Sequence, residues 1–225
     1  MNEEKIGLSL PVTVPLHTIP LTINDRTWQV TAVLDQDALL EVADELEYVP
    51  YGYLLWESAI GLSTYLGRNA DWLCGKRILE LGTGVGLPGL VAQSLGAQVW
   101  QTDHQPGALT LAAHNAAQNG IAGIQQFLGD WRRWEHDIQY DLLIGSDILY
   151  ERAMHTWIEP IFSRNLAQGG KLILADPSRP QALEVLARME DQGWRFEIEM
   201  QTLPAVQFRK PTPSVDVAVY YVVKS

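Results

Sequence analysis

With 225 residues, the chain is long enough for one large α/β domain and short for two. Its net charge of −11 argues against DNA or RNA as a partner, since nucleic-acid binders usually carry a basic face, whereas an acidic surface attracts basic proteins. The single cysteine leaves no internal disulfide and no long apolar run follows the N-terminus, so we expect a cytoplasmic protein without signal peptide or membrane span.

The first fifty residues are rich in β-type runs. Three such runs cover residues 8–14, 16–23 and 27–33, and turn-forming residues 24–26 predict a hairpin between the last two. Residues 35–46 fit a short helix or a loop. We expect residues 1–50 to be a β-rich appendage of a single domain that spans residues 1–225, with a core from residue 51 to residue 225.

Beyond the appendage, strands and helices alternate. An amphipathic helix is predicted within residues 51–66, with Trp56, Ile60 and Ser63 on one face. Apolar runs at 76–81, 97–102, 124–128, 141–146 and 171–175 predict strands, and helical patterns at 106–119, 153–165 and 180–192 separate most of them. Two alternating runs, 194–203 and 215–223, follow without a helix between them and should pair antiparallel. The pattern predicts a Rossmann-like, seven-stranded, mostly parallel sheet with helices on both faces.

The segment from residue 78 to residue 95 has the pattern of a strand, a glycine turn and a helix. Gly82, Gly84 and Gly86 alternate after the strand, and Pro88 suits the first turn of the helix. Dinucleotides and S-adenosylmethionine both bind turns of this kind. The dinucleotide pattern fails in register with the strand end, and Glu80 would repel a pyrophosphate but suit a cationic ligand. A tight turn that binds nothing is the remaining alternative.

Acidic and aromatic residues follow the next two strands. Asp103, 21 positions after Gly82, can accept the hydroxyls of a ribose or cap the next helix, and it suits either cofactor. His104 can stack on an adenine or face water. Asp130 can accept an adenine amino group, and Trp131 can cover the ring or pack in the core. The five histidines show no metal-ligand spacing, so we expect no metal.

Over about residues 50–180, the chain resembles the seven-strand methyltransferases of the protein-lysine group called family sixteen. The matching motifs are spread along the sequence: Tyr51 to Trp56, Glu80 to Gly86, Thr102-Asp103, Asn115 with Asn119, Asp130-Trp131, and Asp147-Ile-Leu-Tyr150. The glycine loop is specific only to the class, whereas the tryptophan motif together with Asp147-x-x-Tyr150 is more specific. Residues 1–50 and 194–225 match nothing we can name.

The resemblance implies a class I fold and S-adenosylmethionine as cofactor. The cofactor contacts expected from it are Trp56, Glu80, Gly82, Thr83, Gly84, Gly86, Asp103, His104, Asp130, Trp131 and Ser146. Asp147 and Tyr150 should close the fourth core strand beside the glycine turn and form the catalytic pair, with Asp147 binding and aiming the acceptor amine. The proton would leave to water or to Tyr150. Arg179, after the fifth core strand, can pair with a substrate acid or with Asp176.

We therefore expect an S-adenosylmethionine-dependent methyltransferase that N-methylates a protein side chain, lysine in the first place, by in-line transfer. A small-molecule amine is the alternative acceptor. An NAD-dependent dehydrogenase and a non-catalytic methyltransferase-like scaffold are the alternatives from other classes. We expect a monomer or weak dimer whose partner is the methyl acceptor, without nucleic acid or membrane.

Overall fold

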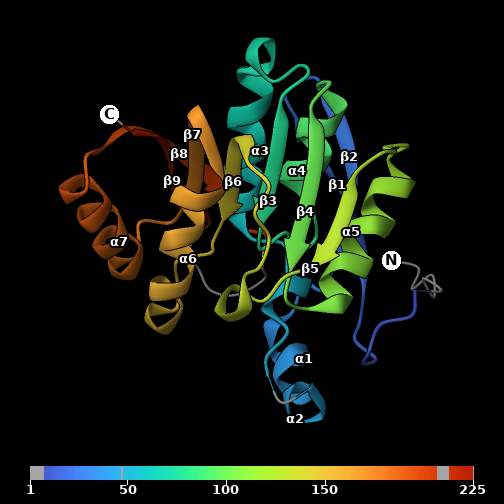
Figure 1. Ribbon diagram of the computed structural model, residues 1–225. Coiled ribbons are helices and arrows are strands. Elements are labelled where there is room, and N and C mark those ends of the chain that lie inside the picture. Colours follow the sequence, from blue (N-terminus) through green and yellow to red (C-terminus); the bar gives the residue numbers. More distant parts are fainter. Residues whose placement is uncertain (1–7, 47, 207–212, 225) are drawn as a thin grey trace.

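A seven-stranded sheet forms the centre of the computed structural model, which describes residues 8–46, 48–206 and 213–224 (Figure 1). The strand order is β5-β4-β3-β6-β7-β9-β8. The strands are β3 (Arg77–Leu81), β4 (Gln98–Asp103), β5 (Gln125–Leu128), β6 (Tyr140–Ser146), β7 (Leu166–Asp176), β8 (Trp194–Pro204) and β9 (Ser214–Lys224). The strands from β3 to β7 run parallel, and β9 is antiparallel to both β7 and β8. The sheet confirms the predicted fold class, including the antiparallel pair at its C-terminal end.

Helices cover both faces of this sheet. The helical elements are α1 (Gln36–Glu41), α2 (Ala43–Leu46), η1 (Tyr51–Tyr53), α3 (Glu57–Arg68), η2 (Ala70–Trp72), α4 (Leu87–Ser94), α5 (Pro106–Gln118), η3 (Trp131–Arg133), α6 (Arg152–Asn165) and α7 (Pro180–Asp191). Helices α3 and α4, with part of α5, pack on one face, whereas α6 and α7 pack on the other. None of the helices in the described ranges has the length and apolar character that a membrane span requires.

The side chains of the central strands divide between two cores. Ile78 and Ile144 point to the α3 and α4 side, whereas their neighbours Leu79 and Leu143 point to the α6 and α7 side. Successive side chains of a strand alternate between faces, so a strand covered on both sides must be apolar at nearly every position. This requirement explains the continuous apolar runs in the sequence.

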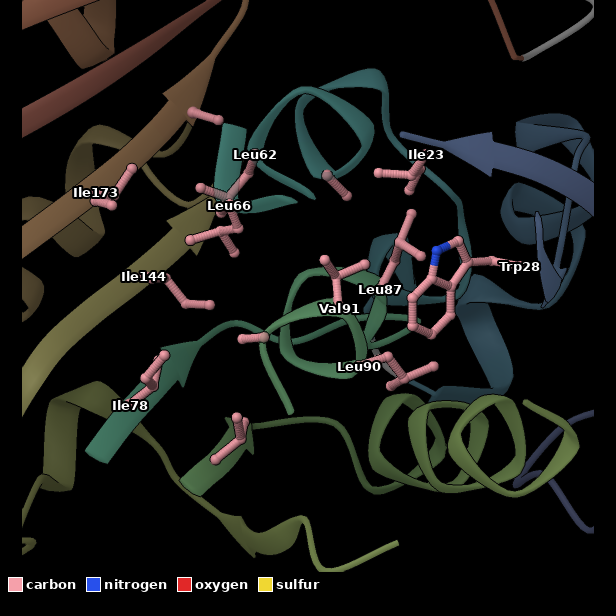
Figure 2. Close-up of a cluster of buried hydrophobic side chains, with 14 of the residues drawn as sticks. Ile23, Trp28, Leu62, Leu66, Ile78, Leu87, Leu90, Val91, Ile144 and Ile173 are labelled. Atoms are coloured by element: carbon pink, nitrogen blue, oxygen red, sulfur yellow. The ribbon is translucent and has the colours of Figure 1, made fainter. Parts of the chain in front are cut away.

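The N-terminal hairpin, β1 (His17–Ile23) with β2 (Arg26–Ala32), packs on helices and does not join the large sheet. Trp28 of β2 belongs to the buried cluster that contains Leu87 and Leu90 of α4, as Figure 2 shows. The Asn115 side chain of α5 accepts a hydrogen bond from the Thr31 N–H at 2.8 Å. The hairpin therefore packs on α4, which follows the glycine turn, and is hydrogen-bonded to α5.

Two local predictions were wrong. Residues 8–14 form no strand; Pro11 and Pro15 interrupt the run, and proline cannot donate to a sheet ladder. Trp56 is not on the helical face but precedes the helix as its extended N-cap residue, with φ −101° and ψ 145°. Residues 1–7 of the expected appendage and 207–212 of the loop before β9 lie outside the described residues.

Candidate active site

A cavity of about 680 Å³ opens at the carboxyl ends of the parallel strands. The strand order reverses there, because the chain continues from β3 to β4 and β5 on one side and then to β6 and β7 on the other. Ligands of open α/β sheets bind at such switch points, and the volume is in the range of small-molecule sites. All the predicted site residues except Glu80 and Gly86 line the cavity.

The glycine turn forms the floor of the cavity and is held by its own hydrogen bonds. The Thr83 N–H donates to the Thr102 carbonyl at 3.0 Å, and the Gly84 N–H donates to Asp103 Oδ2 at 3.0 Å. A Cβ on Gly84 would lie 3.1 Å from the Gly52 carbonyl oxygen, so the two segments approach closely. Because these N–H groups are already paired, the turn offers less to a phosphate than a free anion-binding loop does.

Glu80 lies behind the turn and does not line the cavity, contrary to its predicted contact with a cationic ligand. Its side chain is 2% exposed. Oε2 accepts hydrogen bonds from Thr83 Oγ1 and Gln101 Nε2, each at 2.7 Å. Burial raises the pKa of Glu80 to about 7, although these hydrogen bonds oppose the shift. Glu80 therefore supports the turn from beneath.

Gly86 also serves packing in this structure, although a cofactor contact was predicted. It is the N-cap of α4 with a left-handed φ of 86°. A Cβ there would lie 2.7 Å from the Cβ of Ala112 on α5. The absence of a side chain at Gly86 thus lets α4 and α5 approach each other, and it shapes the cavity only indirectly.

Asp103, at the end of β4, presents a nearly buried carboxylate to the cavity. Its Oδ1 accepts the Gln105 N–H at 3.0 Å, and its Oδ2 accepts the Gly84 N–H. Each oxygen has a second lone pair, so both can still accept hydroxyl donors. Burial raises the pKa of Asp103, and the backbone hydrogen bonds oppose this. Gln105 beside it lines the cavity, and its side-chain oxygen is buried with no hydrogen-bond partner among the described residues.

Near the end of β5 the cavity is lined by aromatic side chains and by Asp130, whose carboxylate is already paired with Arg132. Asp130 caps η3 and binds Arg132 through both carboxylate oxygens at 2.8 to 3.2 Å. The hydrogen bond from Arg132 lowers the pKa of Asp130. Trp131 lines the cavity, and the ring of His104 lies 6.0 Å from that of Tyr48. The aromatic groups are thus more available to a flat ring than the Asp130 carboxylate is.

Asp147 follows β6 in a left-handed conformation, with φ 57°. Its backbone N–H donates to the Ala175 carbonyl at 2.9 Å, which continues the pairing with β7. Its carboxylate is bound by Arg179, which also reaches Asp176 Oδ2 at 3.2 Å. A left-handed aspartate costs roughly 1–2 kcal/mol and is retained where other contacts fix it.

Three aromatic side chains line the same cavity as Asp147. The Tyr51 ring lies 6.3 Å from the Trp56 ring and 6.3 Å from the Tyr150 ring, and both pairs meet edge to face. Trp56 Nε1 donates to the Tyr51 carbonyl at 3.1 Å, which fixes the indole. Desolvation and the nearby Glu151 carboxylate raise the pKa of Tyr150 to about 12. Tyr150 therefore stays protonated at neutral pH.

The charges of the lining favour a cationic ligand. Acidic side chains come from Asp103, Asp130, Asp147 and Glu151. Among the described lining residues the one lysine or arginine is Arg132, which is paired with Asp130, and Asp147 is paired with Arg179 outside the lining. An acidic pocket repels a pyrophosphate and attracts an ammonium or a sulfonium. S-adenosylmethionine fits this lining, since the Asp103 carboxylate can accept its hydroxyl groups and Gln105 borders the cavity with a side-chain oxygen that has no partner among the described residues. Among the described residues, no group of His, Cys, Asp and Glu side chains has the arrangement of a metal site.

Some lining residues were missed from the sequence. Tyr48 and Val49 come from the appendage, where no motif marked them. Gln105 and Ile148 are direct neighbours of predicted residues, so proximity to a motif was the available signal. Tyr51 stood inside the quoted tryptophan motif but was not selected.

Comparison with known proteins shows the family of the chain. A family model described as lysine methyltransferase matches residues 34–190. Protein N-lysine methyltransferase METTL21A of Danio rerio is 31% identical over 180 residues, which cover 76% of this chain and 77% of that protein. Histone-arginine methyltransferase METTL23 of Xenopus laevis is 31% identical over 123 residues, which cover 52% of this chain and 53% of that protein. The chain thus spans about half the length of the METTL23 relative.

Among solved structures, the ribosomal protein L11 methylase of Lactobacillus delbrueckii subsp. bulgaricus superposes with a TM-score of 0.59 at 21% identity. The match covers 76% of this chain and 81% of that chain, and it shows the fold. The sequence match and the fold together place the chain in the class of methyltransferase-family proteins with a Rossmann-like fold. The chain belongs to the lysine methyltransferase family, whose model matches most of its length.

Proposed function

We propose that this methyltransferase N-methylates a lysine side chain of a protein at the Asp147 end of the cavity. The observation that carries the proposal is the grouping of Asp147 with the rings of Tyr51, Trp56 and Tyr150. A carboxylate oxygen as hydrogen-bond acceptor and aromatic rings in one cavity suit a slender alkylammonium, through hydrogen bonding and cation–π attraction. METTL21A, named for protein N-lysine methylation, also aligns with more of the chain than METTL23 does.

The cofactor would lie across the strand ends, over the glycine turn. Asp103 would hold the ribose, Gln105 and the aromatic groups of His104 and Trp131 would surround the adenine, and Trp56 would meet the methionine end. When bound, S-adenosylmethionine supplies a methyl group that its sulfonium activates for displacement by an amine. The chain supplies alignment, and holding reactants in line is worth up to roughly 7–11 kcal/mol.

The acceptor amine must be neutral before it can attack. A lysine with a pKa of about 10.4 is about 5 kcal/mol away from its neutral form at pH 7. Asp147 orients the amine but favours the ammonium, and Tyr150, with its pKa of about 12, is a poor base at this pH. We therefore assign the proton to water at the open side of the cavity. Tyr150 forms a wall and offers its hydroxyl as a hydrogen-bonding group.

Transfer of tritiated methyl groups to lysate proteins tests the proposal. Wild-type protein should label a protein fraction, acid hydrolysis should yield methyllysine, and Asp147→Ala should lose the labelling while calorimetry shows S-adenosylhomocysteine affinity within about threefold of wild type. Leu128→Ala, which changes an exposed side chain outside the cavity lining, is the control and should label normally.

Other outcomes select the alternatives. Label confined to small molecules would indicate a small-molecule amine as acceptor. Methylarginine in the hydrolysate would indicate that the acceptor side chain is arginine and not lysine. Calorimetric binding of NAD in place of S-adenosylmethionine, or an active Asp147→Ala variant, would overturn the proposed site.

A further inference from the structure

Arg179 links the two strand ends beside the methyl-transfer site. It is the N-cap residue of α7, and its backbone N–H donates to Asp176 Oδ1 at 2.7 Å. Its guanidinium Nη1 binds Asp147 and also Asp176 Oδ2 at 3.2 Å. The Asp147 and Asp176 side chains are 8% and 3% exposed, against 29% for Arg179. One cation thus serves two nearly buried acids that end neighbouring parallel strands.

The backbone around this bridge is built to hold it. Asp147, whose carboxylate belongs to the bridge, and Ser178, which directly precedes Arg179, are both left-handed, with φ of 57° and 61°. Ser178 Oγ lies 3.3 Å from the Tyr220 hydroxyl of β9. Residues other than glycine adopt this conformation at a cost, so its occurrence at Asp147 and next to Arg179 points to a geometry that the fold maintains.

The charges that face the bridge come from several elements. They are Asp147 after β6, Asp176 at the end of β7 and Glu57 at the start of α3, and the neutral hydroxyl of Tyr220 on β9 faces Asp176. Glu57 is also held by the Val206 N–H at 2.8 Å. Arg179 is the cation that the structure shows bound to Asp147 and Asp176. Without it, an acceptor amine would meet uncompensated carboxylates.

We propose that Arg179 is a positioning residue that neutralises Asp147, so that the acceptor amine is held without being trapped as an ammonium. This inference rests on the proposed function of Asp147. A carboxylate raises the pKa of a neighbouring amine, whereas a cation lowers it. The Asp147 carboxylate oxygens can therefore orient the acceptor amine, while the opposite charge of Arg179 keeps the net electrostatic effect of the pair on the pKa of the amine small.

The pH dependence of methyl transfer tests the role. Tritiated S-adenosylmethionine and the lysate protein fraction that wild type labels are the probes. Arg179→Gln should label about tenfold or more slowly at pH 7, and the midpoint of its pH–rate profile should move up by about one unit or more, so that the difference from wild type narrows toward pH 10. Its apparent KM for the protein fraction should stay equal or fall, since the more negative site favours the ammonium.

Three variants separate charge from structure. Arg179→Lys keeps the cation and should restore much of the wild-type midpoint. Asp176→Asn removes one carboxylate from Arg179 and should move the midpoint the other way, to lower pH, which tests the idea even if Arg179→Gln does not fold. Arg68→Gln, which breaks an exposed pair with Glu199, should leave the profile unchanged.

The outcomes distinguish this inference from the proposed function. If wild type labels no protein at any pH, the proposed function fails and the role of Arg179 with it. If wild type labels protein but Arg179→Gln and Asp176→Asn lose activity equally at every pH, without opposite shifts of the midpoint, Arg179 is only a structural residue. Calorimetry with S-adenosylhomocysteine should show unchanged affinity for each folded variant.

Discussion

Asp103 and Asp130 both line the cavity near the end of a strand, but their carboxylate oxygens differ in how many further hydrogen bonds they can accept. Asp103 accepts one backbone N–H on each oxygen and retains free lone pairs toward the cavity. Asp130 gives both oxygens to Arg132. The carboxylate of Asp103 is therefore the one available for the ribose, although both residues follow a strand of the same sheet edge.

We expect Asp103→Ala to weaken S-adenosylmethionine binding by about 1.5–3 kcal/mol, or roughly 10- to 150-fold in Kd, because it removes charge-assisted hydrogen bonds. Asp130→Ala should cost less than about threefold, since its carboxylate is occupied. Isothermal titration calorimetry of both variants measures the difference. Equal losses would show that Arg132 releases Asp130 to the cofactor.

Glu80 carries a pH-dependent cost of folding. Its pKa is about 7 in the folded chain against 4.5 for the free side chain, so the folded state holds the proton more tightly. The resulting destabilisation is fully present above pH 7, about 3 kcal/mol, and disappears as the pH falls to about 4.5. Glu80→Gln should therefore narrow the difference in Tm between pH 5 and pH 8. Thermal denaturation of both proteins at the two pH values checks this, and an unchanged difference contradicts it.

The acids at the site could be predicted only in part from the sequence. A carboxylate at a strand end is easily placed at the ligand edge of a parallel sheet, and Asp103 and Asp147 lie there. Glu80 is the residue before the last of β3, and its side chain binds Gln101 of β4. Whether such a strand residue faces a ligand or a neighbouring strand depends on the register of β3 with β4. That register, and the ion pair of Arg179 with Asp147, depend on tertiary contacts between distant segments.

The N-terminal hairpin and the glycine turn are joined through one amide. Asn115 of α5 accepts from the Thr31 N–H at 2.8 Å and donates to the Thr31 carbonyl at 3.0 Å and to the Val85 carbonyl at 2.9 Å. Its side chain is fully buried. The resemblance marked Asn115 as a motif residue, but the hairpin partner came only with the structure, because the two segments are 84 residues apart.

Asn115→Ala should lower the free energy of unfolding by about 2–4 kcal/mol, since it leaves buried backbone groups without partners. Asn119→Ala is the matched control: its amide also binds the hairpin, at the Gln29 backbone, but in an exposed position where water can replace it. We expect less than about 1 kcal/mol there. Urea denaturation followed by circular dichroism compares the two, and similar losses would argue against Asn115 as the joint between the elements.

At the scale of the whole molecule, one stretch of the chain that reaches the cavity is acidic and carries no basic residue. Residues 34–67 contain seven acidic residues and no lysine or arginine. This stretch includes α1 and α2, which lie beyond the carboxyl ends of β4 and β5 in Figure 1, and Tyr48 and Tyr51, which line the cavity. A protein acceptor with basic residues around its lysine would be drawn to this side of the molecule, whereas a small amine would feel only the local field.

We expect methyl transfer to lysate protein to slow by about tenfold or more in kcat/KM between 50 and 500 mM salt, because the Debye length falls below about 5 Å and steering by surface charge is lost. The variant Asp44→Asn/Glu45→Gln should show a weaker salt dependence, since both acids lie on the exposed helix α2. Glu190→Gln/Asp191→Asn, at the end of α7, removes the same charge far from the cavity lining and should keep the wild-type dependence. A rate independent of salt in all three proteins would contradict electrostatic docking and favour a small-molecule acceptor.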